Sequence, residues 1–200
     1  QGEIAHLNVG PENWQLPIPM KHTAQGWSFD MAAGAAEIET RTIGRNELSA
    51  IQVVSAYADA QHEYQQITGQ YAQRFVSTEG QHDGLYWPVK EGEAPSPLGP
   101  AFGDAKAGSD YHGYYYRILT SQGANASGGA LSYIENGKMT KGFALIAWPA
   151  AYGHTGVTSF MINQQGEVYQ QDLGENTDAA AKAITTFDPD AKWQKVDDGE

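Results

Sequence analysis

Histidine and aspartate neighbours are the residues of this sequence best suited to acid–base chemistry. His82 directly precedes Asp83, and His112 lies two positions after another aspartate. An imidazole oriented by a carboxylate would serve as the general base of a hydrolase if a nucleophile lay beside it. Ser159 falls inside a predicted strand, and Gly108-Ser109-Asp110 lacks the second glycine of a nucleophile elbow. A hydrolase with a His-based site is therefore an alternative, and we predict no catalytic centre.

Metal-ligating residues are present without a ligand spacing. No two of the six histidines form a His-x-x-x-His pair; they are His6, His22, His62, His82, His112 and His154. The absence of cysteine excludes thiol catalysis and Cys-type zinc sites. Asp188 and Asp190 are the alternative for a metal site, a Ca²⁺ site, although their spacing matches no EF-hand loop. Gly128-Gly129 and Gly137 make no phosphate-binding loop, so we expect no cofactor.

Aromatic residues offer a second kind of site. Tyr86 and Trp87 lie in a loop, and we expect His112, Tyr114 and Tyr116 to share one strand face. Together these five side chains would form a surface on which a sugar ring or another small ligand stacks. Aromatic residues also favour strands for packing alone, so core packing is the competing interpretation.

Charge limits the classes of partner. The 200 residues include 12 basic and 24 acidic residues, for a formal net charge of −12, and nine of the acidic residues lie in residues 167–200. This excess disfavours nucleic acid and anionic membrane surfaces as partners, and we interpret the acidic end as solvated. No apolar run is long enough to span a membrane. We expect other proteins as partners, including further copies of the chain in a homo-oligomer or filament.

The elements that would position these residues begin with a short β-meander. Residues 1–31 contain three short strand-like runs, separated by turns at residues 10–13 and 21–26. Three such strands form only a marginal sheet alone. We therefore expect two domains, a meander at residues 1–33 that is the remnant of an upstream segment and an α+β domain at residues 34–200.

The strongest helical pattern follows the meander. Apolar residues recur at steps of three at Leu48, Ile51, Val54 and Tyr57, and the pattern continues seven residues later at Tyr64 and Ile67. Residues 35–43 are helical in composition too, and Gly44 predicts a kink or short break between two helical pieces. Asn46 would cap the second piece, and Gly69 would stop it. We expect the apolar stripe to pack on the strand Phe143–Trp148.

An antiparallel sheet is predicted for residues 112–173, with Phe143–Trp148, apolar on both faces, as a central strand. A short helix is predicted at residues 176–187. Residues 69–111 are irregular, and we expect Leu85-Tyr86-Trp87-Pro88 to anchor them in the core. The fold class is therefore α+β, with a long helix of the N-terminal half packed on an antiparallel sheet and preceded by a short β-meander.

Six segments in this order resemble a known family: residues 44–52, 83–88, 96–100, 112–115, 142–150 and 168–174. The series resembles the bacterial exported family described as domain of unknown function 2950, from about Trp14 to Val196. The resemblance carries no established activity. Members of that family typically have a signal sequence and a further N-terminal segment, and this chain starts at Gln1. The resemblance therefore implies a periplasmic or secreted protein after signal-peptide removal.

The order of elements is also similar to that of the globular part of type IV pilins and pseudopilins. The likeness lies in a long helix before an antiparallel sheet and in the stretch Gly142–Gly166, whereas the hydrophobic N-terminal helix of pilins is not in this sequence. It implies a pilin-like fold. We expect a non-enzymatic envelope protein that binds or assembles with other proteins. The alternatives are a small-ligand or glycan-binding module that uses the aromatic loop, and the hydrolase.

Overall fold

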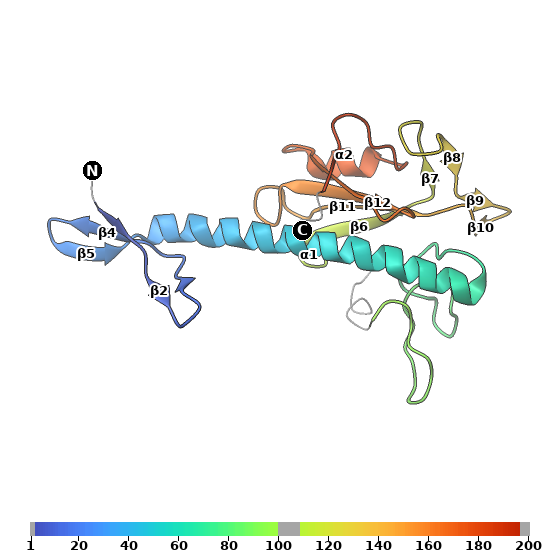
Figure 1. Cartoon of the computed structure of the whole chain (residues 1–200), viewed down its shortest axis with the longest axis horizontal. Coiled ribbons are helices and arrows are strands. Elements are labelled where there is room, and N and C mark those ends of the chain that lie inside the picture. The colour runs from blue at the N-terminus through green and yellow to red at the C-terminus, as the bar shows by residue number, and fades with distance from the viewer. Residues whose placement is uncertain (1–2, 100–108, 197–200) are drawn as a thin grey trace. The chain divides into compact units, whose positions relative to one another are not determined.

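The computed structural model describes residues 3–99 and 109–196 and confirms the α+β class (Figure 1). By its internal contacts the chain divides into two compact units, Gln1–Arg45 and Asn46–Glu200, with the division inside the first helix. Two parts of the predictions lie outside the described residues. They are the loop positions 100–108 and the acidic residues Asp197, Asp198 and Glu200.

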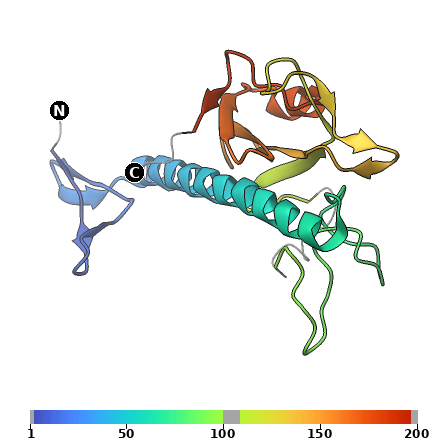
Figure 2. The ribbon, with the colours of Figure 1, turned by 45° about the vertical axis from the view of Figure 1, so that its right-hand side comes forward.

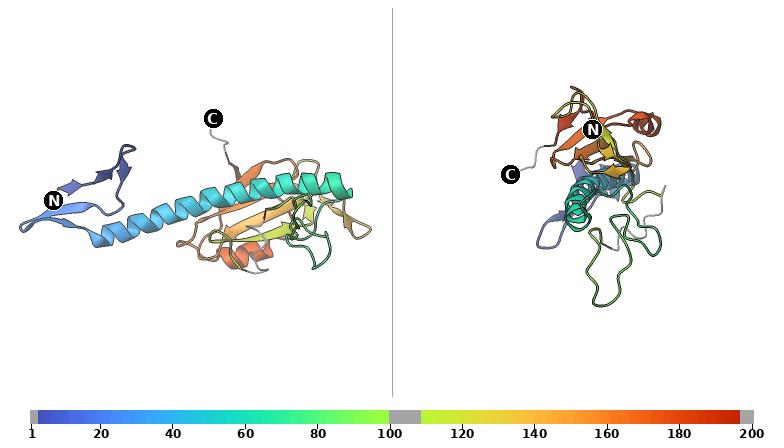
Figure 3. Two further views of the ribbon diagram at one scale, coloured as in Figure 1. Left: turned by 90° about the horizontal axis from the view of Figure 1, so that it is seen from below. Right: turned by 90° about the vertical axis from the view of Figure 1, so that its right-hand side faces the viewer.

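The N-terminal unit contains a three-stranded antiparallel sheet and a separate hairpin, drawn in blue in Figure 3, left. The sheet has the order β1-β4-β5, with β1 at Ile4–Ala5, β4 at Met20–Thr23 and β5 at Gly26–Phe29. The hairpin pairs β2, Asn8–Val9, with β3, Trp14–Gln15. The turn predicted at residues 21–26 is wrong, because Met20–Thr23 pairs with Gly26–Phe29 and leaves only Ala24 and Gln25 to turn the chain.

Helix α1, Met31–Thr68, begins at a side-chain cap. Asp30 Oδ1 accepts the backbone N–H of Ala33 at 3.2 Å, and this hydrogen bond is the main reason that the pKa of Asp30 lies below its usual value. Gly34 follows in the first turn against Ile18. A Cβ on Gly34 would lie 2.9 Å from the Ile18 side chain, so the close approach of helix and loop requires glycine here.

The predicted break at Gly44 is wrong, because α1 is continuous through it. A helical glycine costs about 1 kcal/mol relative to alanine, which good helix formers on both sides offset. Asn46 therefore caps nothing, and its side-chain Nδ2 instead donates to the carbonyl oxygen of Thr155 at 2.9 Å. The C-terminal end is as predicted, since the helix stops before Gly69, whose φ is +74°.

The second unit is built on a five-stranded antiparallel sheet of order β14-β13-β12-β11-β6. Its strands are β6 (Tyr114–Leu119), β11 (Ala144–Pro149), β12 (Thr158–Asn163), β13 (Val168–Asp172) and β14 (Gln194–Lys195). Every residue of β11 is buried, and the strand lies between β6 and β12, which confirms the predicted internal strand.

Helices cover both faces of this sheet, as Figure 2 shows. On one face, the Tyr57 ring of α1 lies 5.6 Å from the Phe143 ring, edge to face, and Tyr57 Oη donates to the carbonyl oxygen of Ala144 at 3.3 Å. On the other face lies α2, Thr177–Ala183, where Trp148 Nε1 donates to Asp178 at 3.1 Å. A strand covered on both faces is apolar throughout, as β11 is.

The second helix is shorter than the predicted 176–187. The chain turns extended at Ile184, and the Arg117 guanidinium of β6 donates to the carbonyl oxygens of Ala181, Lys182 and Ile184. The end of the helix leaves the carbonyl groups of Lys182 and Ile184 without an intrahelical partner, whereas that of Ala181 also accepts the N–H of Ile184 at 3.2 Å. A contact from a distant strand thus accompanies the end of α2, and no local sequence signal marks it.

The apolar stripe predicted for α1 is only partly buried. Val54, Tyr57 and Tyr64 are buried, as predicted, and Ile51 is partly buried. Leu48 and Ile67 are 65 % and 61 % exposed, so placing them against the sheet was wrong. A helix turns about 100° per residue, so a position nine residues before Tyr57 faces the opposite side.

Four short strands between β6 and β11 were not predicted. β7, Ser121–Gln122, pairs with β8, Leu131–Ser132, and β9, Ile134–Glu135, pairs with β10, Lys138–Met139. Asn136 and Gly137, which join β9 to β10, have φ values of 52° and 77°. An Asn-Gly pair with two positive φ angles is the preferred two-residue hairpin turn, so this dipeptide was an available signal.

The substitution Phe143→Ala tests the packing of α1 on the sheet. Phe143 is fully buried, so its removal should lower the free energy of unfolding by about 3–5 kcal/mol in urea titrations. Leu48→Ala, on the exposed side of the same helix, is the control and should change it by less than about 0.5 kcal/mol. A loss under about 1 kcal/mol for Phe143→Ala would contradict the packing.

Candidate functional site

Large apolar side chains are exposed throughout the N-terminal unit. Eight of them are Ile4, Leu7, Val9, Trp14, Trp27, Phe29, Met31 and Ile38. Within residues 3–45 no apolar side chain is buried, and the buried core of the described chain begins only at Ala50. Exposed apolar surface concentrated in one region marks a site of interaction. We call these eight side chains the N-terminal apolar surface.

The β1-β4-β5 sheet has one aromatic face and one charged face. Cross-strand partners Met20–Phe29 and His22–Trp27 lie on the same face because side chains alternate along a strand. Trp27 packs against the His22 ring at 5.1 Å, yet Trp27 and Phe29 each remain 46 % exposed. The opposite face carries Lys21, which pairs with Asp30 at 3.3 Å, and Ile4, the cross-strand partner of Lys21. The sheet is amphipathic, and its aromatic face is open to solvent.

The β2-β3 hairpin repeats this arrangement. Val9 and Trp14 are cross-strand partners and are each 54 % exposed. A cavity of about 330 Å³ lies between the hairpin and the start of α1. Its Arg41 donates to the carbonyl oxygen of Gln15 at 2.7 Å and pairs with Glu37 at 2.8 Å. Because Arg41, Glu37 and Gln15 bind one another, we take the exposed apolar surface, and not the cavity, as the candidate site of this unit.

In the second unit, residues 70–99 are anchored as expected. Leu85 and Trp87 are buried, Tyr86 is partly buried and Pro88 is exposed. The segment pairs with the chain before it, since Tyr86 N–H donates to the carbonyl oxygen of Phe75 at 2.8 Å. Trp87 also stacks on the His82 ring, with the ring centres 4.3 Å apart. Tyr86 and Trp87 therefore support this segment from inside.

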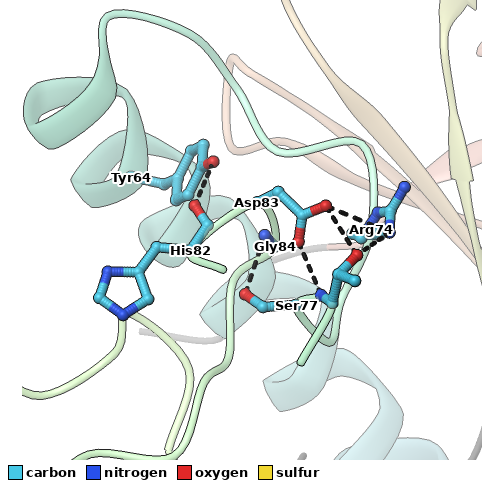
Figure 4. Close-up of polar contacts among 7 residues, drawn as sticks. Tyr64, Arg74, Ser77, His82, Asp83 and Gly84 are labelled. Carbon is cyan, nitrogen blue, oxygen red and sulfur yellow. Dashed lines mark hydrogen bonds and ion pairs between the residues drawn. The ribbon is translucent and has the colours of Figure 1, made fainter. Parts of the chain in front are cut away.

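Ser77, His82 and Asp83 lie close together but are oriented for a turn, as Figure 4 shows. Both Asp83 oxygens accept hydrogen bonds from Thr78, at 2.7 Å from its N–H and 2.9 Å from its hydroxyl. Ser77 Oγ accepts from the N–H of Gly84 at 3.0 Å, and the His82 ring points away from Asp83. The three side chains have the residue types of a catalytic triad without its hydrogen bonds. Ser159, one of the two serines weighed as nucleophiles in the sequence, is fully buried in β12.

The remaining predicted aromatic residues lie at the start of β6. The prediction that His112 shares a strand face with Tyr114 is wrong, because His112 and Gly113 form a tight turn with φ values of 52° and 76°. Tyr114 is fully buried and donates to the carbonyl oxygen of Thr158 at 2.8 Å. Tyr116 donates to the carbonyl oxygen of Tyr111 at 3.3 Å. Burial raises the pKa of both Tyr114 and Tyr116.

Asp188 and Asp190 each accept a hydrogen bond from a backbone N–H group. Asp188 Oδ1 accepts from the backbone N–H and side-chain amide of Asn125, at 2.8 and 3.1 Å. Asp190 accepts from the N–H of Lys192 at 2.9 Å. Across residues 3–99 and 109–196, no group of three or more metal-ligating side chains has a geometry that would hold an ion. Asp190 thus stabilises a local turn, and Asp188 joins its segment to Asn125, 63 positions away in the sequence.

The residue types of the N-terminal apolar surface do not mark it as a site, because none of its side chains does acid–base chemistry. In the sequence, Trp14, Trp27 and Phe29 indicate only strands of the meander. The available signal was the number of large apolar residues in a segment whose few short strands cannot bury them. Burial is a property of the folded unit, so this signal identifies the segment but not which faces stay exposed.

Comparison with known proteins adds a family. The family model described as "Protein of unknown function (DUF2950)" matches residues 1–196. No curated protein and no solved structure matches the chain. In the part of the chain that the structure describes, no helix is both long and apolar enough to span a membrane.

Asp83→Asn tests the role assigned to the Thr78–Asp83 turn. The backbone N–H of Thr78 is the main cause of the lowered pKa of Asp83, whose usual value is 3.8. The charged carboxylate therefore stabilises the fold above about pH 4, and this contribution disappears as pH falls through the lowered pKa. In urea titrations from pH 7 to pH 2, wild type should be the more stable protein at pH 7, and the difference should vanish at the acidic end. The exposed neighbour Glu79, changed to Gln, is the control; a difference independent of pH would contradict the assignment.

Proposed function

The chain belongs to the DUF2950 family of proteins of unknown function, and from this premise we propose that it is a non-enzymatic protein-binding or assembly module. Its docking surface is the N-terminal apolar surface. One observation carries the proposal: within residues 3–45 eight large apolar side chains are exposed and no apolar side chain is buried. Burying a fully exposed side chain of this kind is worth about 1.5–3 kcal/mol, and these side chains are 41–69 % exposed, so each would gain about half of that on contact with another protein.

The residue types of this surface support a protein partner at this end of the chain. Interface centres are rich in aromatic residues, and Trp14, Trp27 and Phe29 are three of the eight exposed side chains. The net charge of −12 on the whole chain would keep the molecule soluble while the apolar surface is free.

A periplasmic or secreted location after signal-peptide removal is part of the same proposal, and it is supported by the resemblance to an exported family. The element order supports a pilin-like architecture, because the long α1 precedes an antiparallel five-stranded sheet. A non-enzymatic role is supported by the hydrogen bonds of Ser77 and Asp83, because both side chains accept backbone N–H groups and thereby stabilise the turn in which they lie.

Site-specific photo-crosslinking tests the docking surface. A benzophenone amino acid in place of Trp14, which is 54 % exposed, should form a defined adduct with a protein in the native host. The matched control is the same substitution at Leu48, which is 65 % exposed but lies outside residues 1–45. Equal labelling at the two positions, or no adduct at position 14, would overturn the proposal.

The non-enzymatic part of the proposal is tested by activity. A screen with esterase, glycosidase and peptidase substrates should give no turnover above that of the buffer. Turnover that is abolished by His82→Ala or His112→Ala, while the thermal midpoint is unchanged, would replace the proposal with a hydrolase. The unchanged midpoint matters because His82 also supports Trp87.

A further inference from the structure

Strand β5 has an unpaired edge. It is the last strand in the order β1-β4-β5 and pairs only with β4 among the described strands. Asp30 N–H donates to the carbonyl oxygen of Pro19 at 2.8 Å, so Pro19 and Asp30 form a hydrogen-bonded pair. Hydrogen-bonded and non-hydrogen-bonded pairs alternate along antiparallel strands. Hydrogen-bonded pairs therefore fall at Lys21–Ser28, and the N–H and C=O groups of Trp27 and Phe29 point outward from the free edge.

No side chain on this edge blocks pairing between sheets. Edge strands are usually protected by being very short or by lysine, proline, an inward charge or a bulge. With four residues, β5 is as long as β4 and longer than β1, the other edge strand of the sheet. Strand β5 reads Gly26-Trp27-Ser28-Phe29, with no charge and no proline, and each of its two aromatic side chains is 46 % exposed. The strand therefore offers outward backbone groups and apolar side chains at the same place.

We propose that two copies of the chain associate through β5, paired antiparallel about a two-fold axis at Ser28. This inference rests on the proposed function and names the partner as a second copy. In this register Trp27 lies opposite Phe29 of the second copy, so both outward-pointing residues form hydrogen-bonded pairs. Two aromatic cross-strand pairs form on one face, and the two three-stranded sheets become one six-stranded sheet.

Trp27 and Phe29 supply the apolar contact of the proposed dimer. A half-exposed tryptophan or phenylalanine presents about 100 Å² of apolar surface, so the two side chains bring about 200 Å² from each copy. Ile4 takes no part, because it lies on the other edge of the sheet and shares a face with Lys21. The edge strand supplies the register, and its two aromatic side chains supply the apolar contact.

Charge places little obstacle to a second copy. Residues 1–45 have a net charge of −2, from five acidic and three basic residues. Two copies of the nearly neutral segment meet with little local repulsion, although each whole chain carries −12. Salt should therefore strengthen the association by screening the long-range repulsion.

Disulfide trapping tests the register directly, because the chain has no cysteine of its own. In the proposed register the two Ser28 Cα atoms lie about 4.5 Å apart, within disulfide reach. Ser28→Cys should give a covalent dimer under mild oxidation of the purified protein. Lys21→Cys is the matched control on the same sheet face, where the two Cα atoms would be about 14 Å apart, and it should stay monomeric on a non-reducing gel.

Sedimentation velocity over a concentration series tests the interface without a covalent bond. Wild type should form a dimer whose dissociation constant falls as sodium chloride is raised. Phe29→Lys places a charge on the edge and should weaken the dimer at least about tenfold. Ile4→Lys, at an apolar position 69 % exposed on the other edge of the same sheet, is the control and should dimerise like wild type.

The outcomes separate this inference from the broader proposal. A monomeric wild type at all concentrations, equal trapping of both cysteine variants, or a Phe29→Lys dimer as tight as wild type would overturn pairing through β5. If the protein is monomeric while position 14 crosslinks to a different protein, the second copy is wrong and the docking surface stands. If neither assay detects a partner, both proposals fail. Should Phe29→Lys lose its circular dichroism signal, the two cysteine variants decide.

Discussion

The central constraint in this protein is the burial of strand β11 on both faces. A strand that is apolar throughout must be covered twice, and the covering helices come from distant parts of the chain. Residues 46–68 of α1 cover one face through contacts such as Tyr57 with Phe143, and α2 covers the other through Trp148 and Asp178. The positions of the sheet, the second half of α1 and α2 all depend on this one requirement.

Buried or half-buried polar groups then fix how these layers meet. Gln61 is fully buried in α1, and its amide bonds both the N–H and the carbonyl oxygen of Ala72, at 2.7 and 2.8 Å. Glu47 accepts the backbone N–H groups of Val157 and Thr158, each at 3.0 Å. An unmet buried polar group costs about 1–3 kcal/mol, so these bonds select one arrangement of helix, sheet and loop over its neighbours. The bonds from Gln61 to Ala72 also hold the start of residues 70–99 in place, and the buried side chains of Leu85 and Trp87 hold the later part.

In contrast, the described residues of the N-terminal unit contain no buried apolar core. Short strands and one helical segment give residues 3–45 an amphipathic sheet and a hairpin but no buried apolar side chain. A sheet of three short strands is marginal alone, and contact with another surface would add the apolar burial that the unit lacks. The contrast between a unit with a full core and a unit without one is the physical basis for proposing a role in association.

The sequence by itself determined the α+β class, the internal strand β11, the end of α1 at Gly69 and the anchor at Leu85 and Trp87, because each has a local pattern of period or turn chemistry. Tertiary structure decided the rest. Gly44 stays helical because its cost is small, α2 ends early where Arg117 binds its carbonyl oxygens, and His112 turns out of the strand with Gly113. Which faces stay exposed in residues 3–45 was likewise decided only by folding, since burial depends on what other elements leave uncovered.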